Sequence, residues 1–149
     1  MRQINAAGLQ IIKTCEGLRL TAYKDVRGIP TIGYGHTGNV QMGSFITLPA
    51  ALQLLDHDLE ESEACIDQNV LVPLSDNQFS ALVSLVFNIG AAAFKRSTLL
   101  RLLNRLDFEG AGEQILVWDM ADGKLVPGLL ARRKAEYVLF HTPGVVSSL

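Results

Sequence analysis

The stretch EGLRLTAYKDVRGIPTIGYGH, residues 16–36, decides the fold. Its glycines punctuate short runs of Thr, Tyr and Ile, which is the pattern of extended strands joined by tight turns. Together with the residues that follow, up to position 45, it predicts a small β-hairpin or a three-stranded meander. Apolar residues at helical spacing lie on both sides of this segment, so a small sheet interrupts an otherwise helical chain.

The segment before this stretch predicts a helix. Asn5 is the expected N-cap and Gly17 the expected stop, with apolar residues at about helical spacing between them. Glu16 then falls at the C-terminus of the helix. The helix dipole opposes a negative charge there and favours a protonated carboxylic acid.

The segment after residue 46 predicts a series of helices. Thr47 is the expected cap of a long helix that connects two lobes, and Pro73 closes it. Ser75 and Gln78 form a capping box ahead of the helix expected to be the core. Further helices are expected near residues 97–106, 108–118 and 129–140. The last is preceded by the expected turn residues Asp122, Gly123, Pro127 and Gly128.

Length and composition indicate one globular domain. The chain has 149 residues, of which 48% are hydrophobic and 19% charged, and no linker or repeat divides it. We expect an α+β domain over residues 1–149, with a small β lobe at about 17–46. The larger helical lobe is expected at about 70–149 plus the N-terminal helix.

Several partners are disfavoured by the sequence. A pI near 5.9 argues against nucleic acid as the main partner. The most apolar stretch, residues 79–94, falls short of the roughly 18 apolar residues that a membrane span needs, so stable membrane insertion is not expected. No motif calls for a metal or an organic cofactor. Cys15 and Cys65 are expected to be buried free thiols, with a disulfide between them as the alternative.

Two carboxylates in the opening region suit the hydrolysis of a glycosidic bond. That reaction needs one carboxylic acid to protonate the leaving oxygen, and a second carboxylate or polar group to manage water or the oxocarbenium-like charge. Glu16, at a helix end, is the candidate acid. Asp25 lies in a polar loop and is the candidate for the charged partner.

The spacing of these residues resembles a known family. The pattern E-G-L-R-L-x-x-Y-x-D-x-x-G-x-x-T-I-G-Y-G-H is similar to the signature of phage-type lysozymes, glycoside hydrolase family twenty-four. Similarity continues through residues 81–90, 97–100 and 127–136, and so covers nearly the whole chain. The resemblance implies a lysozyme-like fold, with the saccharide held in a cleft between the two lobes.

The same resemblance assigns roles to three catalytic residues. Glu16 is the implied general acid, Asp25 assists from the opposite side of the sugar, and Thr31 positions the attacking water. Enzymes of this family generally invert the anomeric centre. Inversion requires the two acidic groups to stand roughly 6.5 to 9.5 Å apart, so that a water fits between them.

Other site residues are expected to bind substrate or to support the acid. The resemblance implies an ion pair between His36 and Asp58 and an arginine that pairs with Glu16, Arg132 being favoured over Arg133. Asn88 is expected near the substrate, with a buried, backbone-satisfied amide as the alternative. The aromatic faces of Tyr23 and Tyr34 suit sugar rings, although packing within the small lobe explains them equally well.

The implied biology is lysis of a bacterial host. A phage endolysin of this kind hydrolyses the β-1,4 bond between N-acetylmuramic acid and N-acetylglucosamine in peptidoglycan. We expect a monomer that accumulates in the host cytoplasm, because the N-terminus lacks a secretory signal pattern, and that reaches the periplasm and wall once a holin opens the membrane. A lytic transglycosylase and a non-catalytic peptidoglycan-binding domain are the alternatives.

Overall fold

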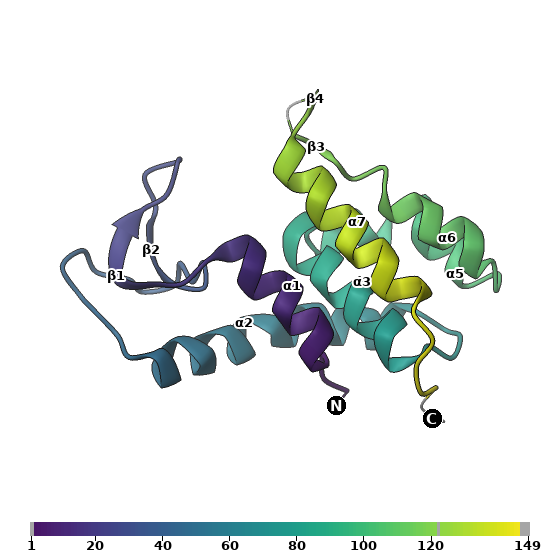
Figure 1. The fold of residues 1–149 in the computed structure, drawn as a ribbon, viewed down its shortest axis with the longest axis horizontal. Helices are drawn as coiled ribbons and strands as arrows, with labels where there is room; N and C mark the ends of the chain where they lie inside the picture. The colour runs from purple at the N-terminus through teal and green to yellow at the C-terminus, as the bar shows by residue number, and fades with distance from the viewer. Residues whose placement is uncertain (1, 122, 147–149) are drawn as a thin grey trace. The chain divides into compact units, whose positions relative to one another are not determined.

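A computed structural model describes residues 2–121 and 123–146 of the chain (Figure 1). It is mainly helical with two small antiparallel hairpins, so the α+β class is confirmed. The elements in chain order are α1 (Ala6–Glu16), β1 (Arg19–Lys24), β2 (Pro30–Gly33), α2 (Leu48–Asn69), α3 (Asp76–Ile89), α4 (Ala91–Lys95), α5 (Thr98–Leu103), α6 (Phe108–Ile115), β3 (Met120–Ala121), β4 (Lys124–Leu125) and α7 (Pro127–His141).

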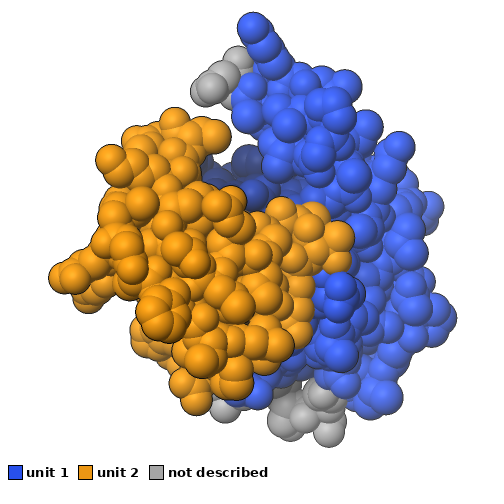
Figure 2. Space-filling model, turned by 60° about the vertical axis from the view of Figure 1, so that its left-hand side comes forward, with its two compact units in different colours: residues 1–12, 61–149 blue, residues 13–60 orange. Residues whose placement is uncertain are grey.

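The chain contacts divide into two compact units, shown in different colours in Figure 2. Unit 2 is residues 13–60 and holds the β1–β2 hairpin. Unit 1 is residues 1–12 and 61–149 and holds α3 to α7. Unit 2 is wider than the expected β lobe, because the end of α1 and the first half of α2 belong to it. The 22-residue helix α2 thus contributes to both units.

Helix α1 begins and ends where the sequence predicted. The Oδ1 atom of Asn5 accepts a hydrogen bond of 3.0 Å from the N–H of Gly8, which is an N-cap contact. Gly17 has a φ of +71°, a left-handed conformation that glycine adopts readily, and its N–H donates to the carbonyl of Lys13. Glu16 is therefore the last helical residue, as expected.

The sheet of unit 2 is a two-stranded hairpin. Strands β1 and β2 pair antiparallel, with Tyr23 opposite Thr31 and Lys24 opposite Pro30. A third segment touches β1 only through an isolated bridge between Thr21 and Phe45. The predicted hairpin is confirmed. In place of the third strand of the alternative meander, the structure has only this single bridge.

Helix α3 is the core of unit 1, as predicted. Ser75 and Gln78 form the expected capping box, with the Gln78 N–H donating to Ser75 Oγ at 3.0 Å. Residues 79–86 are all buried, and α3 packs against α7 (Figure 1). Burying each Leu, Val or Phe side chain in such a core stabilises the fold by about 1.5 to 3 kcal/mol.

The second half of the chain departs from the sequence prediction in three ways. The apolar stretch 79–94 was expected as one core helix, but it is broken at Gly90, with α4 following α3. The short β3–β4 hairpin was not predicted. Pro127 and Gly128 were expected in a turn, but they are the first two residues of α7, where the fixed φ of proline suits the first helical position. Gly123 is in the turn of the hairpin with a φ of +75°. The expected turn residue Asp122 lies outside the described residues.

Candidate active site in unit 2

Glu16 is half-buried at the end of α1, and the backbone of Gly35 closes in on its carboxylate. A Cβ built on Gly35 would stand 2.9 Å from Glu16 Oε2, closer than real Cβ contacts allow. Gly35 also has a φ of +77°, which disfavours other residues. The GYG turn after β2 therefore sets one wall of the space around Glu16, and this wall requires glycine.

Asp25 lies in a tight loop that follows β1. Its Oδ1 atom accepts hydrogen bonds from the N–H groups of Arg27 at 2.8 Å and Ile29 at 2.9 Å. Its own N–H donates to the carbonyl of Ile29, and the N–H of Gly28 donates to the carbonyl of Asp25. A side chain that caps its own loop in this way is held in one orientation.

Thr31 is buried on β2, and its hydroxyl donates to the carbonyl of Ile29 at 2.8 Å. Because a hydroxyl has one proton, the remaining hydrogen-bonding capacity of Thr31 Oγ1 is that of an acceptor. The Ile29 carbonyl thus accepts from both the Asp25 N–H and the Thr31 hydroxyl. Ile29 therefore holds both groups: its N–H donates to the Asp25 carboxylate, and its carbonyl accepts from the Thr31 hydroxyl.

His36 and Asp58 form the pair that the resemblance implied. His36 Nδ1 lies 2.8 Å from Asp58 Oδ2, and its Nε2 lies 2.8 Å from the carbonyl of Gly38. Both ring nitrogens thus lie within hydrogen-bond distance of oxygen atoms. These contacts tie the loop after β2 to helix α2 and occupy both nitrogens of the ring.

The two tyrosines of the hairpin differ in their surroundings. The ring of Tyr23 is half-buried and is covered on one face by the guanidinium of Arg19, whose Cζ lies 4.3 Å from the ring centroid. This packing partner was not predicted. Tyr34 is half-buried in the turn beside Gly35.

The site residues predicted in unit 1 lie on α3 and α7. Asn88 is exposed in the last turn of α3, so the alternative of a buried amide was wrong. Arg132 and Arg133 are both buried, and both contact the carboxylate of Glu136, with the shortest distance, 2.7 Å, from Arg133 Nε to Glu136 Oε1. The pairing of Arg132 or Arg133 with Glu16 stays a prediction.

The buried cluster on α7 also includes Ser84 of α3. Arg132 Nη2 donates to the Ser84 carbonyl at 2.9 Å, and the Ser84 hydroxyl donates to Glu136 Oε2. Burial raises the pKa of Glu136, while Arg133, Ser84 and Arg132 act in the opposite direction. Through these contacts Arg132 is bound to helix α3. Neither Ser84 nor Glu136 was predicted as a site residue.

The described residues show no metal site and no membrane-spanning helix. Among the described residues, no group of three or more His, Cys, Asp or Glu side chains has a geometry that would hold a metal ion. Within the same ranges, no helix combines the length and apolar character needed to cross a bilayer. Neither of the two cysteines, both in the described part of the chain, forms a disulfide; Cys65 is buried as predicted, but Cys15 is exposed, contrary to prediction.

Comparison with known proteins agrees with this architecture. The chain is 47% identical to the endolysin of Salmonella phage P22 over 145 residues, covering 94% of this chain and 99% of the relative. A crystal structure of a P22 lysozyme mutant superposes with a TM-score of 0.89 at 44% identity, covering 95% of this chain and all of that one. The muramidase domain of SpmX from Asticaccaulis excentricus gives 0.88 at 37% identity, covering 96% and 100%.

The fold and these similarities define the protein as a glycoside hydrolase of the lysozyme class. The phage lysozyme family model matches residues 13–136, which is most of the chain. The chain belongs to the phage lysozyme family.

Proposed function

We propose that this protein hydrolyses the β-1,4 bond between N-acetylmuramic acid and N-acetylglucosamine in peptidoglycan. The observation that carries the proposal is the arrangement in unit 2. One carboxylate, Glu16, stands at a helix end against Gly35. A second, Asp25, accepts from the N–H of Ile29, whose carbonyl accepts from the hydroxyl of Thr31. Two carboxylates and a water-binding hydroxyl are the groups that an inverting glycosidase needs.

In the proposed reaction Glu16 donates its proton to the glycosidic oxygen as the bond from that oxygen to the anomeric carbon breaks. Thr31 Oγ1 accepts a hydrogen bond from the attacking water and so orients it, because its own proton is donated to Ile29. The water oxygen bonds to the anomeric carbon from the opposite face of the sugar, and Asp25 takes up the proton that the water loses. The anomeric centre is inverted.

The remaining site residues have supporting roles in the proposal. Asn88, exposed on α3, and Tyr34 contact the glycan, and Tyr23 does so through the ring face that Arg19 leaves open. The His36–Asp58 pair holds the loop that presents Gly35. Arg132, in preference to Arg133, pairs with Glu16.

The biological role we propose is host lysis by a phage or prophage product. Support comes from the similarity to the P22 endolysin along nearly its whole length and to a muramidase domain. In this proposal the protein is a monomer that accumulates in the host cytoplasm, depends on a holin for release, and acts in the periplasm on the wall.

Product analysis on purified peptidoglycan tests the proposed chemistry. We expect new reducing ends, fragments whose mass includes one added water, and an initial product of inverted anomeric configuration by NMR. Fragments that end in an anhydro sugar would identify a lytic transglycosylase instead. Binding to peptidoglycan without release of reducing ends would identify a non-catalytic wall-binding domain.

A further inference from the structure

The chain reversal after helix α5 carries an unusual residue. The N–H of Leu106 donates to the Leu103 carbonyl and that of Asp107 to the Leu102 carbonyl, which is the double hydrogen bond of a Schellman motif. Leu106 occupies the left-handed position of this motif with a φ of +66°. Glycine is the usual residue there, because a side chain crowds the backbone.

Burial does not explain the choice of leucine. The Leu106 side chain is 63% exposed. Among the described residues, the only other non-glycine residue with a positive φ is Asn39, a type that tolerates this conformation. Leu106 therefore holds an apolar side chain in water from a backbone position that disfavours it.

A second exposed leucine lies beside the same turn. The N–H of Leu71, which is 77% exposed, donates to Asn104 Oδ1 at 2.7 Å, and Asn104 Nδ2 donates to the Asn69 carbonyl at 2.9 Å. Asn104 thus fastens the segment after α2 to the end of α5. Leu71 is therefore hydrogen-bonded through its N–H to Asn104, which lies two residues before Leu106 in the chain.

Three exposed arginines accompany the two leucines. Arg96 precedes α5, Arg101 is on it, and Arg105 is in the turn that leads to Leu106. Arg101 and Arg105 are four residues apart, the first on α5 and the second in the turn that follows it. None of the three forms an ion pair within the described part of the chain.

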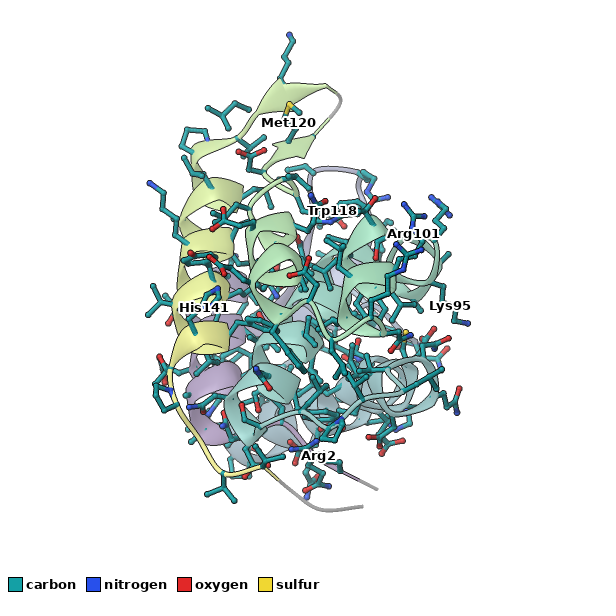
Figure 3. All side chains as sticks on the ribbon, turned by 90° about the vertical axis from the view of Figure 1, so that its right-hand side faces the viewer. Arg2, Lys95, Arg101, Trp118, Met120 and His141 are labelled. Carbon is teal, nitrogen blue, oxygen red and sulfur yellow. The ribbon has the colours of Figure 1, made fainter. Side chains whose placement is uncertain are left out.

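The segment of the chain that carries the arginines is basic. Residues 95–106 contain no Asp or Glu. The next acid, Asp107, accepts from the Gly110 N–H at 2.8 Å as the N-cap of α6. Figure 3 shows Arg101 and Lys95 pointing outward on the side of unit 1 opposite His141. We call Arg96, Arg101, Arg105, Leu71 and Leu106 the α5 surface.

We propose that the α5 surface docks unit 1 onto an anionic phospholipid bilayer. Arginines near such a bilayer are attracted by its negative surface potential, and apolar side chains between them enter the boundary between headgroups and acyl chains. A soluble polyanion would engage the arginines alone. The exposed, left-handed Leu106 favours the bilayer. Transfer of its apolar side chain from water into the apolar part of the bilayer is stabilising, whereas a soluble polyanion offers no such phase.

Co-sedimentation with lipid vesicles tests the proposal on the full chain. Wild-type protein is expected to sediment with vesicles of phosphatidylglycerol and phosphatidylcholine, not with phosphatidylcholine alone, and less so as salt rises. Neutralising Arg101 and Arg105 in R101Q/R105Q is expected to weaken binding by about 30-fold, or about fivefold for each charge. The matched control, K124Q/K134Q, removes two exposed charges elsewhere in unit 1.

The second variant, Leu106→Asn, separates lipid docking from simple charge attraction. Asn tolerates the left-handed conformation, so the fold is expected to be as stable as the wild type or more so, while vesicle binding falls by about fivefold. Val138→Gln is the control, because Val138 on α7 has the same 63% exposure as Leu106. It is expected to bind like the wild type.

Three results would overturn the proposal. The first is absence of wild-type sedimentation with anionic vesicles. The second is undiminished binding by R101Q/R105Q, which would locate the contact elsewhere on the protein. The third is undiminished binding by Leu106→Asn, which would mean that the arginines recognise a polyanion, such as a charged wall polymer, through charge alone.

Discussion

Gly35 approaches the carboxylate of Glu16 so closely that one added methyl group would stand 2.9 Å from Oε2. Gly35→Ala is therefore expected to displace the Glu16 side chain and to lower wall-lytic activity at least tenfold. The left-handed backbone adds a stability loss of about 1 to 2 kcal/mol. Turbidity loss of a purified wall suspension measures the activity, and urea unfolding measures the stability.

Gly43→Ala is the matched control for this prediction. Gly43 has a φ of +91° in the same unit, and a Cβ there meets nothing within 4 Å. The control should lose similar stability but keep its activity. If both variants were equally active, Gly35 would not shape the space around Glu16.

The Thr31 hydroxyl is expected to matter for catalysis more than for stability. Thr31→Val removes the hydrogen bond to Ile29 and the acceptor for the proposed water, so kcat should fall about 100-fold through misplacement of the water. The free energy of unfolding should fall by only about 1 kcal/mol. Thr31→Ser keeps the hydroxyl and should stay within a few-fold of the wild type. Equal rates for Val and Ser would remove Thr31 from the mechanism.

Glu136 is expected to be essential for stability. Glu136→Ala leaves Arg132 and Arg133 buried without the carboxylate between them, and the free energy of unfolding should fall by about 3 to 5 kcal/mol. Urea denaturation measures this loss. Glu109→Ala, which removes an exposed carboxylate in the first turn of α6, should lose less than about 1 kcal/mol. Comparable losses would show that the buried cluster adds little.

The two thiols are expected to react at very different rates. Cys15 is exposed, whereas burial raises the pKa of Cys65 and so lowers its thiolate fraction at neutral pH. A thiol reagent such as iodoacetamide should therefore modify one cysteine quickly and the second only after unfolding. In Cys15→Ser the fast phase should disappear. Its persistence would mean that Cys65 is accessible in the folded protein.

Local signals in the sequence predicted helix ends well. Asn5, Gly17, Ser75 and Gln78 act on atoms three or four residues away, so their roles could be read from spacing alone. The break at Gly90 that separates α4 from α3 was missed, because the apolar pattern continues across it. The two-residue strands β3 and β4 were missed because such short elements have no measurable hydrophobic period.

Contacts between distant positions were the harder part of the site. Glu16, Asp25 and Thr31 were found as a pattern of residue types, but the Gly35 wall depends on how the turn after β2 approaches the end of α1. The shared contacts of Ile29 depend on the conformation of the loop between β1 and β2. Gly35 in the sequence GYGH did indicate a close approach of the backbone to another group, because glycine often marks such a position. The sequence could not show that this group is the Glu16 carboxylate. The contact between the Arg19 guanidinium and the Tyr23 ring could not be predicted, because no pattern in the sequence indicates it.

The activity of Glu16→Gln on purified peptidoglycan is the decisive test of Glu16 as the proton donor. Loss of the proton donor should reduce the rate of wall clearing by about 100- to 10,000-fold. The far-ultraviolet circular dichroism spectrum should remain that of the wild type. Glu60→Gln, at an exposed position of α2, is the control and should clear the wall at the wild-type rate. A Glu16→Gln enzyme as active as the wild type would contradict the assignment of Glu16 as the acid.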